Sequence, residues 1–215
     1  MLIYHQVNKI DNIINGMLHA TLPSRYWEHV DIDFLELEKS KTIIQKNNES
    51  VYEHTMTVID ILTTKNPVTL LAGLFHDLGK GFVTISNDPS LPKFSGHASK
   101  SKEIAIAKLL QWGANKNLVD SVARLIGTHM YSISRITKER SIRKFIADVG
   151  FRNINDWFVL RMADSMSYNK NRQHYAYYIR QFETFIISYL KKYPSGDLQA
   201  SFNLNDINSA QIEGG

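Results

Sequence analysis

The stretch LLAGLFHDLGK, residues 70–80, constrains the fold more than any other part of the sequence. Its large apolar side chains recur at helical spacing and predict a helix that is buried on one face. This helix is expected to end at Gly79 and to present His76 and Asp77 at its C-terminal end. A buried imidazole and a buried carboxylate are both costly without partners, and a bound cation satisfies both. Lys80 adds a positive charge beside this predicted cation site.

The composition limits which metal ligands the chain can offer. It has no cysteine, which excludes disulfides and thiolate sites and leaves histidine, aspartate and glutamate as candidate ligands. The 25 basic and 21 acidic residues give a formal charge of +4, which is too small to indicate nucleic-acid binding but is compatible with a phosphate-bearing substrate.

Helical periodicity runs through the whole chain without strand-like alternation, so the predicted class is all-α, a compact helical fold. Ser50 with Glu53 forms a capping-box pattern, and Asn66 with Pro67 suits the start of the helix that follows. Residues 79–95 are predicted to be a loop. The expected helices cover residues 7–20, 25–44, 51–62, 67–78, 97–112, 117–130, 137–147, 155–169 and 172–193. We expect three parts: an N-terminal helical segment packed on the core (1–48), the main domain (49–194) and a polar tail (195–215).

The N-terminus and the hydropathy of the chain indicate its expected cellular location. The N-terminus lacks the features of a signal peptide, and no run of about 18 apolar residues exists. We therefore expect a soluble, cytoplasmic protein without a membrane partner, whose oligomeric state the sequence does not indicate.

The polar residues predicted to point inward form an ordered series. They are His54, His76, Asp77, His97, His129 and Asp164. With the segments His54-Thr55, HDLGK at 76–80 and FSGH at 94–97, this series resembles the HD superfamily of metal-dependent phosphohydrolases, from about Ser50 to Tyr168. Within that superfamily it is most similar to the HD domain of bacterial CCA-adding tRNA nucleotidyltransferases. Two departures are the alanine at position 98, where that family often has an acidic residue, and the lack of a recognisable nucleotidyltransferase domain.

The resemblance implies a site for one or two divalent ions, from among manganese, iron, nickel, cobalt, magnesium and zinc. His54, His76, Asp77 and Asp164 can surround one ion, while His97 and His129 can hold a second with Asp77 bridging. Alternatively, His97 caps its helix and His129 is a helix-end histidine favoured by the dipole. Asp77 and Lys80 are the candidate catalytic residues, with Lys80 neutralising charge on the phosphoryl oxygens.

The implied activity is hydrolysis of nucleotide or RNA-end phosphates, either 2′,3′-cyclic phosphodiesters or phosphomonoesters, by a metal-activated water. Lys80, Lys100, Arg135 and Arg161 are candidate substrate-binding residues, and Arg161 is alternatively expected to orient Asp164. Other HD relatives hydrolyse second messengers, deoxynucleoside triphosphates or dinucleoside polyphosphates. A non-catalytic HD protein that binds RNA or a nucleotide is the alternative from another class.

Overall fold

The computed structural model describes residues 8–45, 48–62, 64–83, 93–131 and 139–168, together with 179, 182, 184 and 186–188. The helices are α1 (Lys9–His19), α2 (Pro23–His29), α3 (Leu35–Ser40), α4 (Val51–Ile61), α5 (Pro67–Phe75), η1 (Leu78–Phe82), α6 (His97–Gln111), α7 (Lys116–Thr128), α8 (Glu139–Val149), η3 (Phe151–Asn153) and α9 (Ile154–Tyr168). Within these residues there is no strand, which confirms the all-α class.

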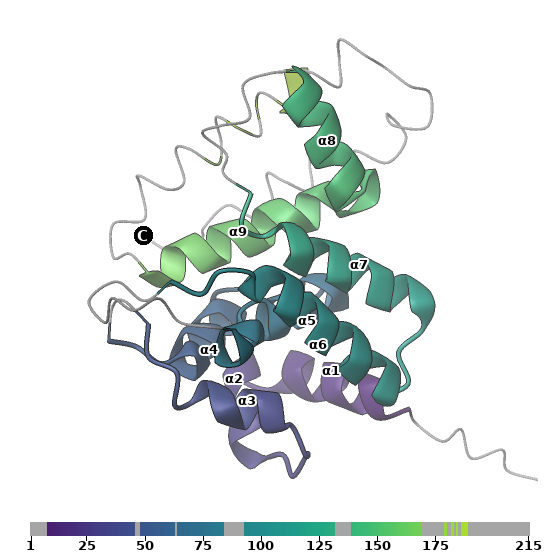
Figure 1. The fold of residues 1–215 in the computed structure, drawn as a ribbon. Coiled ribbons are helices and arrows are strands. Elements are labelled where there is room, and N and C mark those ends of the chain that lie inside the picture. The colour runs from purple at the N-terminus through teal and green to yellow at the C-terminus, as the bar shows by residue number, and fades with distance from the viewer. Residues whose placement is uncertain are drawn as a thin grey trace, which may run out of the picture.

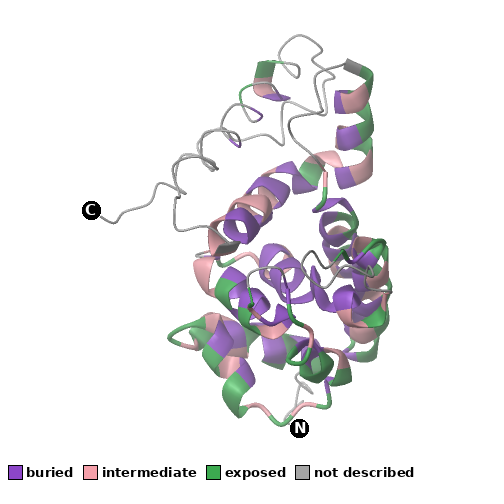
Figure 2. Cartoon of the chain, turned by 60° about the vertical axis from the view of Figure 1, so that its left-hand side comes forward, coloured by how far each residue is buried: buried purple, intermediate pink, exposed green. Residues whose placement is uncertain are grey.

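Helix α5 is the centre of the bundle, and it packs against α4, α6, α7 and α9 (Figure 1). Every residue from Thr69 to Phe75 is buried. The surrounding helices have buried residues on their inner faces and exposed residues on their outer faces (Figure 2). Because a helix that is apolar on all sides must be enclosed, the other helices wrap around α5. The residues that follow its last turn are consequently held deep in the protein.

Local signals start the helices that carry the predicted site. The Ser50 hydroxyl accepts from the Glu53 amide, the Glu53 carboxylate accepts from the Ser50 amide, and this confirms the capping box at α4. Asn66 caps α5 by accepting from the Val68 amide, with Pro67 in the first turn, also as predicted. Gly96 precedes α6 with φ of 81°, a conformation that glycine adopts at little cost.

Helix α9 is tied by side-chain hydrogen bonds to α5 and α7. The Asp156 carboxylate accepts from the Asn66 amide at 2.7 Å and from the Thr69 hydroxyl at 2.8 Å, which joins α9 to the start of α5. The Trp157 indole donates to the Thr128 carbonyl at 3.1 Å, at the end of α7. These bonds fix α9 relative to the start of α5 and to the end of α7, which bears His129.

Two of the predicted elements are wrong. The single helix expected over residues 25–44 is divided into α2 and α3, with extended residues between them. The break falls at Val30–Asp33, where β-branched and aspartate side chains disfavour a helix. Phe34, which follows the break, is buried against Trp27, Phe75 and Trp112.

The central helix does not end at Gly79. Helix α5 ends at Phe75, and Gly79 lies inside η1, so the predicted loop over residues 79–95 begins with helical turns. Gly79 is also not among the residues with positive φ, so it is not a left-handed helix stop. A side chain here would meet the His97 carbonyl at 2.3 Å and the Ser101 amide at 2.4 Å. Glycine is therefore required by the close approach of η1 to α6.

The C-terminal predictions lie largely outside the described residues. Of the helix expected over 172–193, the described positions are helical, and Ile179, Phe182 and Ile186 are buried. Phe182 packs its ring on Phe145 and Trp157. The polar tail from residue 195 is outside the described part, and the division into three segments stays a prediction.

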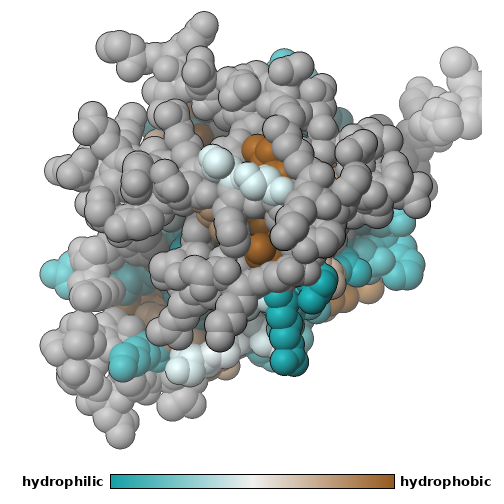
Figure 3. Space-filling view, turned by 90° about the horizontal axis from the view of Figure 1, so that it is seen from above, coloured by the Kyte–Doolittle hydropathy of each residue, from teal (hydrophilic) through white to brown (hydrophobic). Residues whose placement is uncertain are grey.

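None of the helices among the described residues combines the length and the apolar character that crossing a membrane requires. On the face drawn in Figure 3, the apolar atoms of the described residues reach the surface only in small areas.

Candidate metal centre

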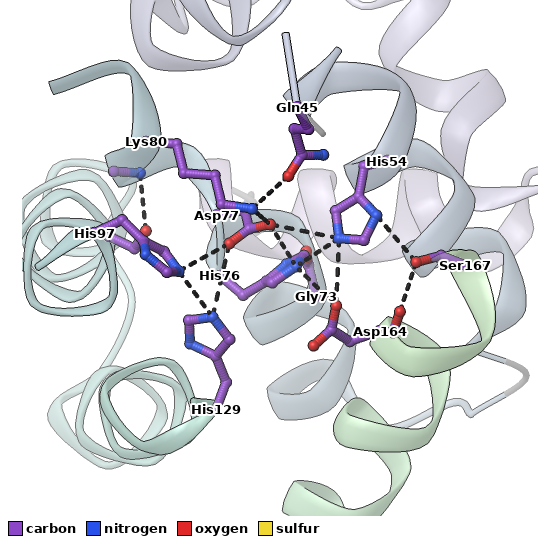
Figure 4. Close-up of polar contacts among 12 residues, drawn as sticks. Gln45, His54, Gly73, His76, Asp77, Lys80, His97, His129, Asp164 and Ser167 are labelled. Carbon is purple, nitrogen blue, oxygen red and sulfur yellow. Dashed lines mark hydrogen bonds and ion pairs between the residues drawn. The ribbon is translucent and has the colours of Figure 1, made fainter. Parts of the chain in front are cut away.

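The six residues predicted as metal ligands converge in space, although 110 positions separate the first from the last in the sequence. His54 comes from α4, His76 and Asp77 from the junction of α5 and η1, His97 from the first residue of α6, His129 from the end of α7, and Asp164 from α9 (Figure 4). All six are buried, with exposed fractions between 0% and 7%. So many polar groups without access to water need partners of their own.

The six side chains form two groups of three, each with its ligand atoms within 4.8 Å of one another. The first triad is His54, His76 and Asp164, and the second triad is Asp77, His97 and His129. In the first triad, His54 Nε2 lies 3.3 Å from His76 Nε2 and 3.3 Å from Asp164 Oδ1. In the second triad, His97 Nε2 lies 3.3 Å from His129 Nε2.

Asp77 joins the two triads through its two carboxylate oxygens. Its Oδ1 lies 3.2 Å from His97 Nε2 and 3.6 Å from His129 Nε2, within the second triad. Its Oδ2 lies 3.4 Å from His54 Nε2 and 3.3 Å from His76 Nε2, within the first triad. One carboxylate therefore has an oxygen at each of the two groups, which is the arrangement that a bridging ligand needs.

The ring nitrogens of three of the four histidines show which atoms are available for binding. His76 Nδ1 lies 2.8 Å from the Gly73 carbonyl, His97 Nδ1 2.8 Å from the Phe94 carbonyl, and His129 Nδ1 2.7 Å from the Ile126 carbonyl. A carbonyl only accepts, so each of these Nδ1 atoms carries the hydrogen. In the neutral rings, the Nε2 atoms that face one another therefore have a bare lone pair.

His97 Nε2 and His129 Nε2 lie 3.3 Å apart in the second triad, and two lone pairs at this distance repel each other unless a proton or a cation lies between them. Two nitrogens bound tetrahedrally to one zinc ion at about 2.0–2.1 Å are themselves about 3.3–3.4 Å apart. The spacing in both triads thus fits a cation shared by the rings. The Nδ1 bonds to carbonyls are also the usual outer contacts of metal-binding histidines.

Each carboxylate has a cationic side chain on one oxygen. Lys80 Nζ donates to Asp77 Oδ2 at 2.6 Å and also to Gln45 Oε1. Arg161 Nη1 donates to Asp164 Oδ2, which leaves Asp164 Oδ1 directed at His54. The prediction that Arg161 orients Asp164 therefore agrees with the observed bond.

The electrostatics keep both carboxylates ionised. Burial would raise the pKa of Asp77, but His76, Lys80 and His129 together hold it well below the usual value. Burial likewise opposes ionisation of Asp164, but His54, His76 and Arg161 lower its pKa. An ionised carboxylate is the form that binds a cation.

The histidines at the two triads respond differently to the same burial. Burial would lower the pKa of His76, but the carboxylates of Asp77 and Asp164 outweigh it and raise that pKa. Burial lowers the pKa of His129, with Asp77 opposing and His76 adding to the decrease. A cation in the cluster would replace the proton that His76 otherwise attracts.

The contacts of His97 and His129 bear on their two alternative roles, as helix-end residues or as members of the cluster. Gly96, rather than His97, is the N-cap residue of α6, and the His97 side chain makes no capping bond there. His129 does donate to a carbonyl of the last turn of α7, as a helix-end histidine would, while its Nε2 faces Asp77. Both rings therefore reach the cluster.

Two contributors were missed from the sequence. Gln45 lies in the turn before α4, is buried, and accepts from Lys80. Ser167 lies one turn after Asp164 in α9, with its Oγ 3.0 Å from His54 Nδ1. No sequence signal marks Gln45, whereas the spacing of Ser167 from Asp164 places both on one helix face.

The remaining candidate residues lie outside the cluster or outside the described part. Lys100 Nζ pairs with Glu103 Oε2 at 2.9 Å on the surface of α6. Arg135 falls outside the described residues. An open groove of about 700 Å³ between α6, α7 and α8 has two basic residues, Lys102 and Arg124, and two acidic ones, Asp120 and Asp148. Because these charges cancel, the groove does not indicate a polyanion.

Comparison with known proteins shows what the region around this cluster is similar to. Residues 51–150, under half of the chain, match the family described as HD domain. The chain is also similar to the CC-adding tRNA nucleotidyltransferase of Thermus thermophilus, with 37% identity over 101 residues. That alignment covers 44% of this chain and 22% of the relative, so the chain spans under a quarter of that protein. Gln45, Asp164 and Ser167 lie outside the HD match.

Proposed function

We propose that the chain is a divalent-metal-dependent phosphohydrolase that acts on nucleotide or RNA-end phosphates. The observation that carries this proposal is the pair of buried triads that share the carboxylate of Asp77. The HD domain match supports it, because this superfamily contains metal-dependent phosphohydrolases. The two oxygens of Asp77 make two ions the expected number.

The ligand set favours some metals over others. Four imidazole nitrogens and two carboxylates suit manganese, iron, cobalt, nickel and zinc, whereas magnesium prefers oxygen ligands and water. His54, His76 and Asp164 would hold one ion, and Asp77, His97 and His129 the other. When bound, such ions polarise phosphoryl oxygens and lower the pKa of water to about 7.

The charge of the protein groups favours an anionic substrate. The two carboxylates of the cluster are each paired with one cation, Asp77 with Lys80 and Asp164 with Arg161, so these four groups sum to zero. These four groups therefore provide no net negative charge to balance the positive charge of a bound divalent ion. A phosphate ester supplies the missing negative charge, and the low dielectric of a buried site strengthens the attraction.

Lys80 and Arg161 are the proposed contacts for the phosphoryl group. Lys80 is buried beside Asp77, so its ammonium can offset charge that develops on phosphoryl oxygens as the reaction proceeds. Arg161 has a buried Nε that donates to no described residue, while its side chain is 25% exposed. A phosphoryl oxygen that binds beside this side chain, at the edge of the cluster, would give the Nε donor an acceptor.

The proposed reaction is the addition of water across a P–O bond. The water oxygen forms a bond to phosphorus, the bond to the leaving oxygen breaks, and the leaving oxygen takes up a proton. A 2′,3′-cyclic phosphodiester would give a phosphomonoester, and a phosphomonoester would give inorganic phosphate and an alcohol. RNA ends are the favoured source, because the similar Thermus thermophilus protein is named for adding nucleotides to tRNA.

The test is metal-dependent hydrolysis by the purified full chain. Candidate substrates are adenosine 2′,3′-cyclic phosphate, RNA oligonucleotides ending in a 2′,3′-cyclic or 3′-phosphate, a deoxynucleoside triphosphate and a dinucleoside tetraphosphate, each with manganese or after chelation. Turnover is expected with the first two, and it should be lost in His76→Ala and Asp77→Ala. His29→Ala is the matched control, because His29 is exposed at the end of α2 and should keep full activity.

The other outcomes distinguish the alternatives. Turnover confined to the triphosphate or the dinucleoside tetraphosphate would replace the RNA-end substrate while keeping the reaction class. Stoichiometric binding of RNA without turnover of any substrate, at full metal occupancy, would contradict the enzyme and support a binding protein.

A further inference from the structure

His54 is held differently from the other three histidines of the cluster. His76, His97 and His129 each donate from Nδ1 to the backbone carbonyl three residues earlier, at a helix end or just before a helix start. His54 lies at the fourth residue of α4, where the preceding carbonyls belong to the helix, and the Ser50 carbonyl accepts from the His54 amide. Its ring therefore needs a partner from another element.

Among the described residues, Ser167 on α9 lies at hydrogen-bond distance from the Nδ1 atom of this ring. The Ser167 hydroxyl donates to the Asp164 carbonyl at 2.6 Å, and its oxygen lies 3.0 Å from His54 Nδ1 (Figure 4). A serine hydroxyl has one hydrogen, and that hydrogen is already directed at the Asp164 carbonyl. Ser167 can consequently only accept from His54, which requires the hydrogen of the neutral ring to be on Nδ1.

We propose that Ser167 is a positioning residue, which keeps the proton of His54 on Nδ1 and its Nε2 lone pair free for the first triad. Without Ser167, Nε2 is the more favourable position for the hydrogen of the neutral His54 ring. His54 Nε2 lies 3.3 Å from Asp164 Oδ1 and 3.4 Å from Asp77 Oδ2, and both oxygens are anionic acceptors. A hydrogen on Nε2 would bond to these carboxylates, and Nε2 could not then bind a metal.

Ser167 also couples two ligands of one triad. It bonds to His54 through Oγ and to the backbone of Asp164 through its hydrogen, while the second triad has no contact with it among the described residues. The loss of Ser167 should therefore affect the first triad more than the second. This consequence rests on the proposed metal centre, whereas the tautomer of His54 does not.

The first experiment measures the tautomer in the metal-free full chain. Nitrogen-15 spectra recorded at about pH 9, above the usual range of histidine titration, distinguish the two neutral forms of the ring. His54 is identified as the signal that is missing from His54→Gln. We expect the Nδ1–H form in the wild type, the Nε2–H form in Ser167→Ala, and the Nδ1–H form again in Ser167→Thr, whose hydroxyl can make the same bonds.

Ser40→Ala is the matched control for the loss of a helical hydroxyl. Ser40 is buried in α3 and donates to the carbonyl three residues earlier, at 2.6 Å, as Ser167 does, but it contacts no histidine of the cluster among the described residues. The His54 spectrum should be unchanged in this variant. A proton on Nε2 of His54 in the wild type, or the same tautomer in the wild type and Ser167→Ala, would overturn the proposal.

The second experiment measures binding of manganese and of zinc by equilibrium dialysis. In Ser167→Ala, one of the two ions is expected to bind about 10- to 100-fold more weakly, as is typical for loss of a hydrogen bond behind a metal ligand, while the other keeps its affinity. Ser167→Thr should restore the wild-type isotherm. Equal affinities for both ions in the wild type and a folded Ser167→Ala would contradict the positioning role.

The two experiments separate this inference from the proposed function. A wild type that binds no divalent ion but has the Nδ1–H tautomer, and loses it in Ser167→Ala, would refute the metal centre and support the role of Ser167. A wild type that binds two ions, but has His54 protonated on Nε2 in the metal-free state, would support the metal centre and refute the role of Ser167.

Discussion

Substitution of Gly79 by alanine tests the close contact between η1 and α6. An added Cβ would lie 2.3 Å from the His97 carbonyl oxygen and 2.4 Å from the Ser101 amide, about 1 Å short of the 3.4 Å of ordinary contact. Both atoms belong to the backbone of the first turn of α6, so no side chain can move aside. The amide of Gly79 also donates to the Ser101 hydroxyl at 2.8 Å, and that bond would be strained.

The expected cost follows from overpacking at a buried site. Inserting one methyl group into a packed contact typically costs about 1–3 kcal/mol. In a chain of this size each kcal/mol lowers Tm by about 2–4 °C, which gives an expected decrease of about 2–12 °C. Displacement of α6 by the added methyl group would also move His97 away from Asp77. The His97 Nε2 atom now lies 3.2 Å from Asp77 Oδ1, so the second triad would be weakened.

Thermal unfolding and metal binding of the same preparations measure both effects. The control is Gly81→Ala, two residues further along η1, where the added Cβ would meet only side-chain atoms of Lys39 and Ile43 at 3.5 Å or more. We expect Gly81→Ala to retain the Tm and both ions. Equal Tm values for the two variants, with unchanged metal affinity in Gly79→Ala, would refute the interpretation of Gly79 as a close-contact glycine.

Three further changes test other parts of the structure. Ser50→Ala removes the cap of α4 and should lower the free energy of unfolding by about 1 kcal/mol in urea titrations, while Thr57→Ala, on the exposed face of the same helix, should not. Lys80→Met leaves the buried Asp77 carboxylate without its cation and should cost the metal-free protein about 3–5 kcal/mol. Added zinc should reduce that deficit, and an unchanged deficit in calorimetry would contradict the role of Asp77 as a ligand. Burial raises the pKa of Asp156 despite its bonds from Thr69 and Asn66, so this carboxyl favours folding below the unfolded pKa and loses that contribution as pH rises through the folded pKa. Asp156→Asn should therefore gain stability relative to the wild type as pH rises above about 4, and a constant difference in Tm across that range would contradict this sign.

The sequence predicted the residues of the buried cluster because their chemistry is unusual for apolar helices. His54, the pair at 76–77, His129 and Asp164 lie in or at the ends of buried segments, where a polar side chain needs a partner. Local signals such as the capping box of Ser50 and the cap of Asn66 depend only on neighbouring residues, and the structure confirms them. The helical class followed from periodicity along the whole chain.

What the sequence could not predict depends on contacts between distant segments. Gly79 has the same local pattern whether it ends a helix or lies against another helix, and only the position of α6 decides between them. The division of α2 from α3 places Phe34 among Trp27, Phe75 and Trp112, which is a tertiary effect.

The polar supports of the site were missed for a similar reason. Gln45 and Ser167 are ordinary polar residues in the sequence, and neither occurs in a metal-binding pattern. Their importance arises because the fold brings one to Lys80 and the other to His54, across 35 and 113 positions. Such outer contacts follow from the packing of α4 and α9 around α5, rather than from any local signal.

The most direct test of the two-triad account is anomalous X-ray diffraction from crystals of the full chain soaked in manganese, recorded at the manganese absorption edge. The account predicts two peaks, one on either side of the Asp77 carboxylate, the first among His54, His76 and Asp164 and the second between His97 and His129. A crystal at full manganese saturation with no peak in contact with Asp77, or with its ions bound only elsewhere, would contradict it.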